Sequence, residues 1–238
     1  MLSSGKLKSE DFLEGQILLI DKDSGWTSFD VVNKLRYAIR HNFGIKKIKV
    51  GHAGTLDPLA TGLLIICTGK FTKRIPEFMG LDKEYTGVIR LGATTPTYDL
   101  ESEPDKQYSV AHITDDLIAE KLSQFRGEIM QEPPVFSAIM KDGQRAYKLA
   151  RKGQKVAMEA RPVRVDKFEV ERVNNDLHFR VKCSKGTYIR SLAHDLGRAL
   201  ESGAHLAELR RTAIGNFKVS EAAKVDQYLQ KLRDAAGN

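Results

Sequence analysis

The sequence is poor in the features that mark secreted, membrane and disulfide-rich proteins. Only two of its 238 residues are cysteines, too few for a disulfide framework in a chain of this length. Cys67 and Cys183 both lie in apolar, strand-like runs, so we expect buried, reduced thiols. No apolar run approaches the ~18 residues of a membrane span, and no secretory leader stands at the N-terminus. These absences predict a soluble, cytoplasmic protein without a membrane partner.

Two common types of catalytic site are also missing from the pattern of residues. The six histidines show no metal-ligand spacing with one another or with the cysteines, so we expect no metal site. No serine stands in the glycine-flanked turn that presents the nucleophile of many hydrolases. His194 and Asp195 are adjacent on a predicted helix, where we expect a surface pair.

The charge balance favours a polyanionic partner. The 38 Lys and Arg residues exceed the 31 Asp and Glu residues, which gives a formal net charge of +7 and a pI near 9.3. Such a surplus attracts the phosphates of nucleic acids. Lys46, Lys47 and Lys49 concentrate positive charge just before Gly51, where a solvated edge and an RNA phosphate contact are both compatible with the pattern.

The apolar pattern predicts one mixed α/β domain over residues 1–238. Strands are expected at 16–21, 63–67, 85–91, 163–173 and 177–183, and helices at 27–40, 114–125 and 189–200. The first of these helices opens with a capping box, in which Asp30 follows Thr27 by three residues. Because the connections are mostly of the hairpin type, we expect a mixed, mostly antiparallel sheet flanked by helices. We expect residues 1–14 to be a loose arm and residues 130–160 a small excursion from the domain.

The most distinctive stretch runs from Gly51 to Gly62 and presents one carboxylate, Asp57, just before a buried strand. Pro58 biases the backbone of Asp57 toward an extended or turn conformation, and the glycines permit close approach of a ligand. A functional acid and a plain Asp-Pro turn that caps the strand are both compatible with this stretch taken alone.

A second stretch, Lys185-Gly186-Thr187-Tyr188-Ile189-Arg190, offers an aromatic and a basic side chain. If its backbone is extended, Tyr188 and Arg190 point to the same side. An arginine directed at an aspartate keeps the carboxylate ionised, lowering its pKa by about 1–3 units, and orients it through a bidentate contact. A packed tyrosine and a solvated arginine are the alternative for this fragment.

Together these stretches resemble the sequence pattern of the TruB-type pseudouridine synthases. The match at 51–62 is Gly-His-Ala-Gly-Thr-Leu-Asp-Pro-Leu-Ala-Thr-Gly. Further matches, in the family's order and spacing, are Lys83-Glu84-Tyr85, Arg90-Leu91-Gly92, Ser184 through Arg190, Gly203-Ala204-His205 and Leu209-Arg210-Arg211. The resemblance covers about Ile17 to Gly215. It implies the pseudouridine synthase fold and isomerisation of uridine to pseudouridine in the T-arm loop of tRNA, at position 55, without a cofactor.

The resemblance also implies roles for individual residues. Asp57 would be the catalytic nucleophile. Tyr85 would stack on the target uracil and take part in proton removal. Arg190 would pair with Asp57, and Tyr188 would orient that pair.

Four further positions match residues that bind the substrate or support the site. His52 would occupy the space left by the extruded nucleotide, and Leu209 would close the base pocket. Asp99 and Lys22 would lie near the substrate or behind the catalytic residues. The excursion at 130–160 matches the family's thumb, an insertion that clamps the RNA loop.

The sequence departs from the family pattern in two places. The usual Lys-Pro pair of the early turn is Lys22-Asp23 here. The chain ends soon after Leu209-Arg210-Arg211, so we expect no C-terminal RNA-binding (PUA) domain. The grip on RNA would then come from the catalytic domain, the thumb and the lysines at 46, 47 and 49.

Three alternatives compete with a stand-alone tRNA pseudouridine synthase. An RNA-binding or tRNA-folding module of the same fold would not require Asp57, Tyr85 and Arg190 together. A guide-RNA-dependent relative would use the extra C-terminal domain. A nucleoside hydrolase would need a positioned water and a second carboxylate, for which the sequence offers no partner acid. We therefore expect a monomer that acts on tRNA without guide RNA.

Overall fold

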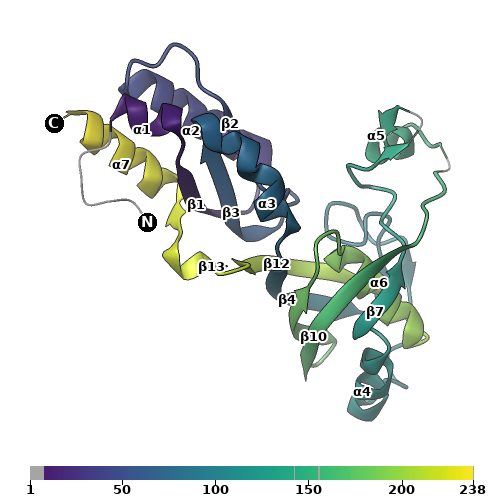
Figure 1. Ribbon diagram of the computed structural model, residues 1–238. Helices are drawn as coiled ribbons and strands as arrows, with labels where there is room; N and C mark the ends of the chain where they lie inside the picture. The colour runs from purple at the N-terminus through teal and green to yellow at the C-terminus, as the bar shows by residue number, and fades with distance from the viewer. Residues whose placement is uncertain (1–7, 142, 155, 238) are drawn as a thin grey trace. The chain divides into compact units, whose positions relative to one another are not determined.

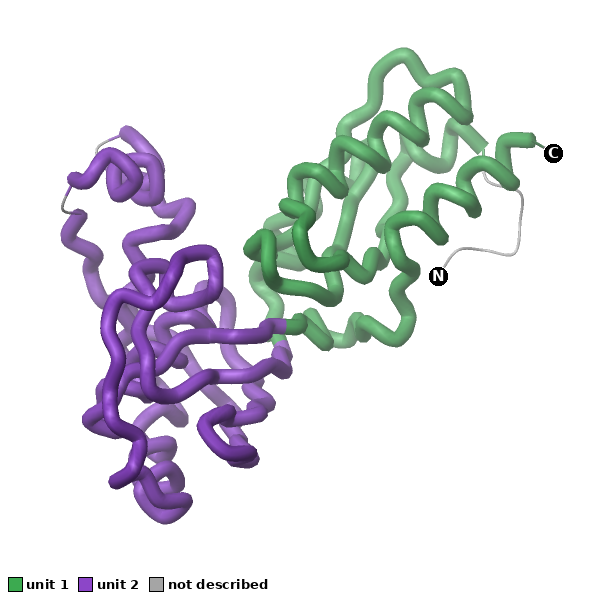
Figure 2. Tube along the Cα trace, turned by 180° about the vertical axis from the view of Figure 1, so that it is seen from behind, with its two compact units in different colours: residues 1–83, 210–238 green, residues 84–209 purple. Residues whose placement is uncertain are grey.

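The computed structural model describes residues 8–141, 143–154 and 156–237, which fall into two units (Figures 1 and 2). Unit 1 comprises residues 1–83 and 210–238, and unit 2 comprises residues 84–209. Helices and strands alternate in both units, which confirms the mixed α/β class. No helix of the described residues has the length and hydropathy that a membrane span requires.

Unit 1 is built on a sheet in which β1 and β3 are central. Its elements are α1 (Ser9–Glu14), β1 (Ile17–Lys22), α2 (Ser28–Asn42), β2 (Val50–His52), β3 (Thr61–Thr68), η1 (Gly69–Arg74), α3 (Ile75–Gly80), the end of β12 (Ala204–Ile214), β13 (Phe217–Lys218), η2 (Val219–Glu221), β14 (Ala223–Lys224) and α7 (Val225–Gly237). β3 lies antiparallel to β1, with Ile17 opposite Cys67 and Lys22 opposite Gly62. β12 joins β3 in parallel, with Arg211 opposite Gly62.

The apolar run in β3 is buried on both faces of this sheet. Leu64 and Ile66 belong to the core under α2 and α7, whereas Leu63 and Ile65 belong to a second core that includes Phe78 of α3. Successive side chains of a strand point to opposite faces, so a strand covered on both sides requires the continuous hydrophobic run found here. The predicted strand at 63–67 is confirmed.

The N-terminal region confirms one expectation and contradicts another. The capping box predicted for α2 is present, since the Thr27 hydroxyl accepts a hydrogen bond from the Asp30 amide at 3.1 Å and the Asp30 carboxylate accepts one from the Thr27 amide at 2.9 Å. The expectation of a loose arm is wrong for residues 9–14, which form α1. Phe12 is fully buried and its ring lies 4.9 Å from that of Phe43. Residues 1–7 lie outside the described part of the chain.

Unit 2 contains an antiparallel hairpin beside a long amphipathic helix. Its elements are β4 (Lys83–Leu91), β5 (Ala93–Thr94), β6 (Lys106–Gln107), α4 (Asp115–Ser123), β7 (Gly127–Gln131), β8 (Met140–Lys141), β9 (Gln144–Arg145), α5 (Ala146–Arg151), β10 (Arg161–Val173), β11 (Asp176–Cys183), α6 (Ile189–Ala199) and the first part of β12. The strand order is β12-β4-β11-β10-β7. β10 and β11 form the predicted hairpin, whose turn holds Asn174 at a φ of 57°.

The excursion expected at 130–160 includes a separate two-stranded sheet and a short helix. β8 pairs with β9, and α5 follows directly. The Ala146 amide donates to the Ile139 carbonyl at 2.8 Å and the Tyr147 amide to the Ser137 carbonyl at 3.1 Å. Residues 142 and 155 of this region lie outside the described part. Its role as a thumb stays a prediction.

Gly197 in α6 permits close packing against Ala204. Alanine in place of glycine usually stabilises a helix, but at this position we expect it to destabilise the protein. A Cβ on Gly197 would lie 2.4 Å from the Ala204 nitrogen. We expect Gly197→Ala to lower the free energy of unfolding by about 1–3 kcal/mol because the overlap outweighs the helix propensity that alanine adds. Urea unfolding followed by circular dichroism measures this.

Gly80→Ala is the matched control, since Gly80 ends α3 with no atom within 4 Å of the added Cβ. It should leave stability unchanged or raise it by up to about 1 kcal/mol. Equal effects of the two substitutions would contradict the packing argument.

Candidate active site

The loop that carries Asp57 is held by a buried arginine of unit 1. The side chain of Arg211 is fully enclosed, at 1% exposure. Its Nε donates to the Leu63 carbonyl at 2.7 Å, its Nη2 to the Gly54 carbonyl at 3.1 Å and its Nη1 to the Thr55 carbonyl at 3.4 Å. One guanidinium thus joins the start of the loop to the strand that follows it.

A buried lysine holds the other side of the same loop. Lys22 has no exposed surface, and its Nζ donates to the carbonyls of Trp26 at 2.6 Å, Asp23 at 3.0 Å and Pro58 at 3.2 Å. Burial lowers the pKa of Lys22 to about 8, while the nearby Asp57 carboxylate opposes that shift. Lys22 therefore holds the backbone next to Asp57, and its role in supporting a catalytic site stays a prediction.

The backbone on both sides of Asp57 is also anchored by α2 and its preceding turn. The Ser28 hydroxyl accepts a hydrogen bond from the Leu56 amide at 2.9 Å and donates to the Leu56 carbonyl at 3.1 Å. The Gly25 amide donates to the Pro58 carbonyl at 2.9 Å. Asp57, which is half-buried, therefore sits on a loop whose backbone is fixed on both sides. A catalytic group needs such preorganisation if it is to act without rearrangement.

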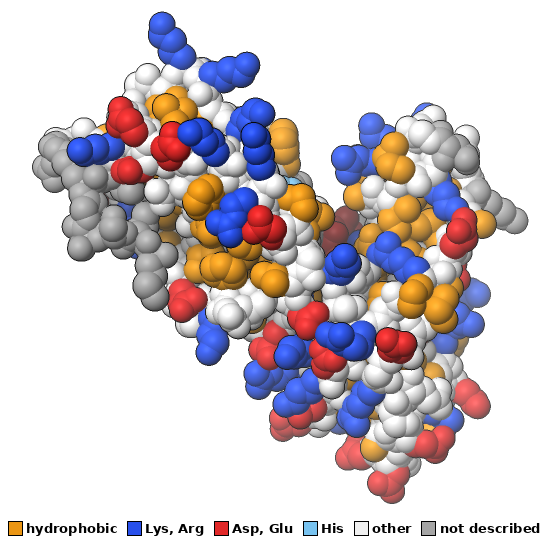
Figure 3. All heavy atoms as spheres, viewed as in Figure 1, with side chains coloured by type: hydrophobic (Ala, Val, Ile, Leu, Met, Phe, Trp, Pro, Cys, Tyr) orange, Lys and Arg blue, Asp and Glu red, His pale blue; other side chains and the backbone are white. Residues whose placement is uncertain are grey.

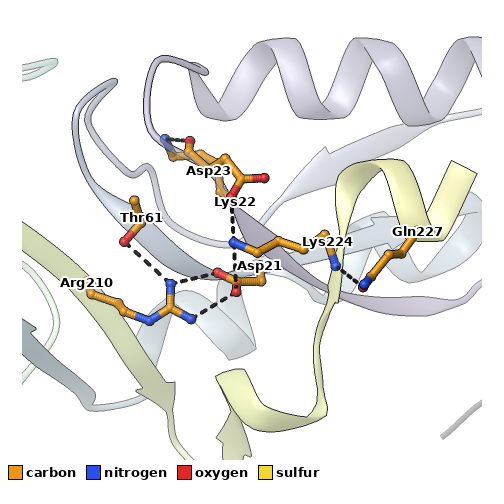
Figure 4. Close-up of polar contacts among 7 residues, drawn as sticks. All are labelled: Asp21, Lys22, Asp23, Thr61, Arg210, Lys224 and Gln227. Atoms are coloured by element: carbon orange, nitrogen blue, oxygen red, sulfur yellow. Dashed lines mark hydrogen bonds and ion pairs between the residues drawn. The ribbon is translucent and has the colours of Figure 1, made fainter.

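An ion-pair network links β1, which carries Lys22, to β12 and β14 (Figure 4). Arg210 contacts both carboxylate oxygens of Asp21, at 3.0 and 2.9 Å, and Lys224 lies 3.1 Å from the same carboxylate. Burial raises the pKa of Asp21, but the hydrogen bonds from Arg210 and Lys224 outweigh it and the net shift is downward. The network keeps Asp21 ionised beside the lysine that supports the loop.

His52 stands on β2, at the start of the Asp57 loop. Burial lowers the pKa of His52, and the charge of Arg211 lowers it further. Its imidazole is therefore neutral near pH 7. A neutral, flat ring is suited to the predicted role of filling a space vacated by a base.

In unit 2, Arg190 is fixed next to Asp99. The Arg190 Nε lies 3.6 Å from the Asp99 Oδ2, and both side chains are only 7% exposed. The Arg190 Nη1 donates to the Thr97 carbonyl at 3.0 Å and the Nη2 to the Phe136 carbonyl at 3.1 Å. The structure thus brings together two residues that the sequence predicted separately.

The extended geometry considered for Tyr188 and Arg190 is wrong. Tyr188 has extended backbone angles, but Arg190 lies in the first turn of α6, so the alternation of a strand does not relate their side chains. Gln131, which sequence reasoning missed, fixes Tyr188 instead. The Tyr188 amide donates to the Gln131 Oε1 at 2.7 Å, and the Gln131 Nε2 donates to the Tyr188 carbonyl at 3.0 Å. No local pattern marks this glutamine.

Tyr85 and Leu209 lie on neighbouring strands of unit 2, β4 and β12. Tyr85 is 9% exposed and Leu209 is half-buried. The two strands approach closely at Gly87, where a Cβ would lie 2.1 Å from the Glu208 carbonyl oxygen. Asp57, His52 and Lys22 belong to unit 1, whereas Arg190 and its neighbours belong to unit 2. The pairing of Asp57 with Arg190 stays a prediction.

The pair His194 and Asp195 is not the surface pair expected from sequence. The His194 ring stacks on Tyr98, with centroids 3.8 Å apart and planes 12° from parallel, and Tyr98 adopts a φ of 63°. Burial lowers the pKa of His194 and raises the pKa of Asp195 to about 6. The side chains lie partly inside unit 2, where a tertiary contact and not the helix pattern determines their positions.

The described residues contain no group of three or more His, Cys, Asp or Glu side chains arranged to hold a metal ion. Cys67 and Cys183 are both buried and neither forms a disulfide, as expected. Burial raises the pKa of the Cys67 thiol to about 11, which leaves it protonated and unreactive at neutral pH.

Comparison with known proteins gives matches along most of the chain. A model of the N-terminal domain of TruB family pseudouridylate synthases matches residues 40–189, and a model of the tRNA pseudouridylate synthase B C-terminal domain matches residues 190–236. The tRNA pseudouridine synthase B of Flavobacterium johnsoniae is 54% identical over 226 residues, which cover 94% of this chain and 99% of that protein. The enzyme of the same name from Chlorobaculum tepidum is 46% identical over 225 residues, covering 94% and 93%.

Solved structures with the same fold are larger. A chain of a Cbf5-Nop10-Gar1 complex aligns with a TM-score of 0.70 and 29% identity over 97% of this chain, which spans 62% of that one. A chain of an H/ACA RNP bound to a substrate RNA containing 2′-deoxyuridine aligns with a TM-score of 0.66 and 29% identity. The alignment covers 94% of this chain and 56% of that one. The predicted pseudouridine synthase fold is confirmed.

The Ser28 contact should be measurable by a single substitution. Ser28→Ala removes the partner of the buried Leu56 amide and carbonyl, so we expect the free energy of unfolding to fall by about 1–3 kcal/mol. Hydrogen exchange at the Leu56 amide should accelerate accordingly. Ser123→Ala in α4 is the control, because its hydroxyl is exposed. Similar small losses for both variants would show that the Ser28 contact does not anchor the loop.

Asp195 should make stability depend on pH in a defined window. Its folded pKa of about 6 exceeds the unfolded value near 3.9, so the folded state binds more protons between these values and stability falls as pH rises through them. We expect Asp195→Asn to be more stable than the wild type at pH 7–8, with the difference vanishing below about pH 4. Thermal unfolding across this range tests it. A constant difference at all pH values would contradict the shift.

Proposed function

This chain belongs to the TruB family of pseudouridylate synthases, and from that premise we propose that it isomerises uridine to pseudouridine in tRNA, at position 55 of the T-arm loop. The observation that carries the substrate is the match to tRNA pseudouridine synthase B along nearly the whole of both chains. The preorganised loop around Asp57 supports the assignment of a catalytic function to that loop.

The reaction first requires access to the base. A uridine stacked in an RNA loop must be turned out, and unstacking costs a few kcal/mol. We assign Tyr85 to stack on the extruded uracil, which can return roughly 1–3 kcal/mol. His52, whose burial favours the neutral ring, would fill the vacated position, and Leu209 would close the pocket.

Asp57 would then act as the nucleophile. Cleavage of the bond between ribose C1′ and uracil N1 builds positive charge on the sugar, where an ionised carboxylate stabilises or traps it. The uracil rotates and forms a new bond from C5 to C1′, the proton leaves C5, and N1 gains one. No water is consumed, so one carboxylate suffices, and water must be excluded because hydrolysis would destroy the RNA.

We assign Arg190 to orient Asp57 and keep it ionised. Asp99 and the carbonyls of Thr97 and Phe136 hold the guanidinium, and Gln131 holds the neighbouring Tyr188. A buried acid and a buried arginine of this kind cost free energy to enclose. Simple RNA binding gives no reason to enclose them, which favours catalysis over an RNA-binding module.

We propose that the chain acts on tRNA without guide RNA. Its identity to the tRNA pseudouridine synthase B proteins is 54% over almost their full length, whereas its identity to the Cbf5 complex and H/ACA RNP chains is 29% over little more than half of theirs. The proposal therefore follows the relatives that match the chain as a whole.

Substitution of Asp57 tests the proposal directly. Incubated with unmodified tRNA and no guide RNA, the wild type should form pseudouridine at position 55, and Asp57→Asn should reduce the rate by more than about a thousandfold. Affinity for tRNA should change by less than about threefold, because the substitution removes charge and not bulk. Mass spectrometry of nuclease fragments maps the product.

Asp226→Asn, an exposed acid in the first turn of α7, is the control and should be fully active. Wild-type protein that binds tRNA but forms no product would favour the RNA-binding module. Full activity of Asp57→Asn would remove Asp57 from its role as nucleophile.

A further inference from the structure

The outward face of α2 carries two large aromatic side chains that the fold does not use. Phe29 is 61% exposed and Tyr37 is 68% exposed, whereas Val31, Leu35 and Ile39 of the same helix are buried in the core of unit 1. Exposed rings of this size cost hydration free energy. The packing of α2 therefore does not explain them.

A stacked pair of rings lies in the C-terminal half of α2. The Tyr37 and His41 rings lie 5.8 Å apart and 6° from parallel, and both side chains are exposed. Tyr37 and His41 are four residues apart and are neighbours on the helix surface, and Phe29, eight residues before Tyr37, belongs to the same inclined row of side chains. A flat aromatic surface is thereby presented outward.

Positive charge surrounds these rings. Residues 28–50 contain six Lys and Arg residues and one acid, Asp30. The basic residues are Lys34, Arg36, Arg40, Lys46, Lys47 and Lys49. Among the described residues none of the six has an ion-pair partner, and Asp30 is engaged by the capping box. Figure 3 shows Lys and Arg side chains projecting where α2 connects to β2.

The face begins next to the Asp57 loop. Ser28, the first residue of α2, bonds to both backbone groups of Leu56, and Phe29 follows immediately. With a rise of about 1.5 Å per residue, Tyr37 lies roughly 12 Å further along the helix axis. An RNA strand whose target nucleotide reaches Asp57 has flanking nucleotides within that distance.

We propose that the α2 face, defined as Phe29, Lys34, Tyr37, Arg40 and His41, is a second contact surface for the tRNA substrate. Phe29 and Tyr37 stack on unpaired bases, and the lysine and arginine bind the adjoining phosphates. Stacking needs bases that are not paired, so the segment bound here belongs to a loop of the tRNA. The inference rests on the proposed function for the identity of the RNA.

The charge pattern favours RNA over a protein partner. The cores of protein interfaces are depleted of charged residues and of lysine in particular, whereas single-stranded nucleic acid sites combine aromatic platforms with a basic track. The α2 face has the second composition.

The stacking part of the inference is tested by replacing the flat rings with apolar side chains. The double variant Phe29→Leu, Tyr37→Leu should raise Kd and KM for tRNA together by at least about tenfold. The loss should appear in KM, and kcat should fall by less than about threefold. The slope of log Kd against log salt should not change, since no charge is removed. Met79→Ala, an exposed apolar side chain of α3 at 48% exposure, is the control.

The phosphate part is tested by Lys34→Gln combined with Arg40→Gln. This variant should reduce the salt slope of tRNA binding by about 1.4, at about 0.7 for each contact to a single strand. Lys231→Gln combined with Arg233→Gln on α7 changes the net charge equally at exposed positions of the same unit and should leave the slope nearly unchanged. Circular dichroism confirms that all variants are folded.

Several results would overturn the inference. Tight tRNA binding by the double leucine variant would do so, and it would leave a protein partner as the reason for the exposed rings. Equal slope changes on α2 and α7 would show a diffuse charge effect and no site. If the wild type binds tRNA without forming pseudouridine, the proposed function fails, but weaker binding by the α2 variants would still support this surface.

Discussion

The structure around Asp57 depends on the hydrogen bonds of one buried guanidinium. Arg211 reaches the loop because β12 lies against β3 so closely that a Cβ on Gly62 would meet the Arg211 carbonyl oxygen at 2.3 Å. A larger residue at 62 would push the strands apart and withdraw the guanidinium from Gly54, Thr55 and Leu63. Gly62 thus permits the close strand approach through which Arg211, far along the chain, holds the Asp57 loop.

Two buried cations in one small region carry a large desolvation cost. Hydrogen bonds to backbone carbonyls offset part of this free-energy cost, because a charged group taken out of water must be hydrogen-bonded. The pKa of Lys22 is lowered by burial, so the hydrogen bonds do not fully offset the desolvation of its ammonium group. Without Arg211 the carbonyls of Gly54 and Thr55 would lose its guanidinium as a donor, so the loop and its supports stabilise each other.

Features encoded locally were predictable from the sequence, and features that depend on distant contacts were not. The structure confirms the predicted strand at the apolar run of β3 and the predicted capping box at Thr27 and Asp30. Each of these signals acts over only a few residues. Phe12 lies in a polar segment, and only its contact with Phe43 reveals α1. The candidate site residues were identified from motifs. Their partners, such as Gln131 for Tyr188, have no local sequence signal. The same is true of the stack of His194 on Tyr98.

Arg210 and Arg211 are neighbours on β12 with opposite tasks. Consecutive side chains of a strand face opposite sides, so Arg210 binds Asp21 on β1 while Arg211 supports the Asp57 loop. A slip of β12 by one residue would exchange the two, placing each guanidinium where its acceptors are missing. The adjacent arginines therefore favour a single alignment of β12, in which the hydrogen bonds that hold the Asp57 loop and the ion pair with Asp21 form together.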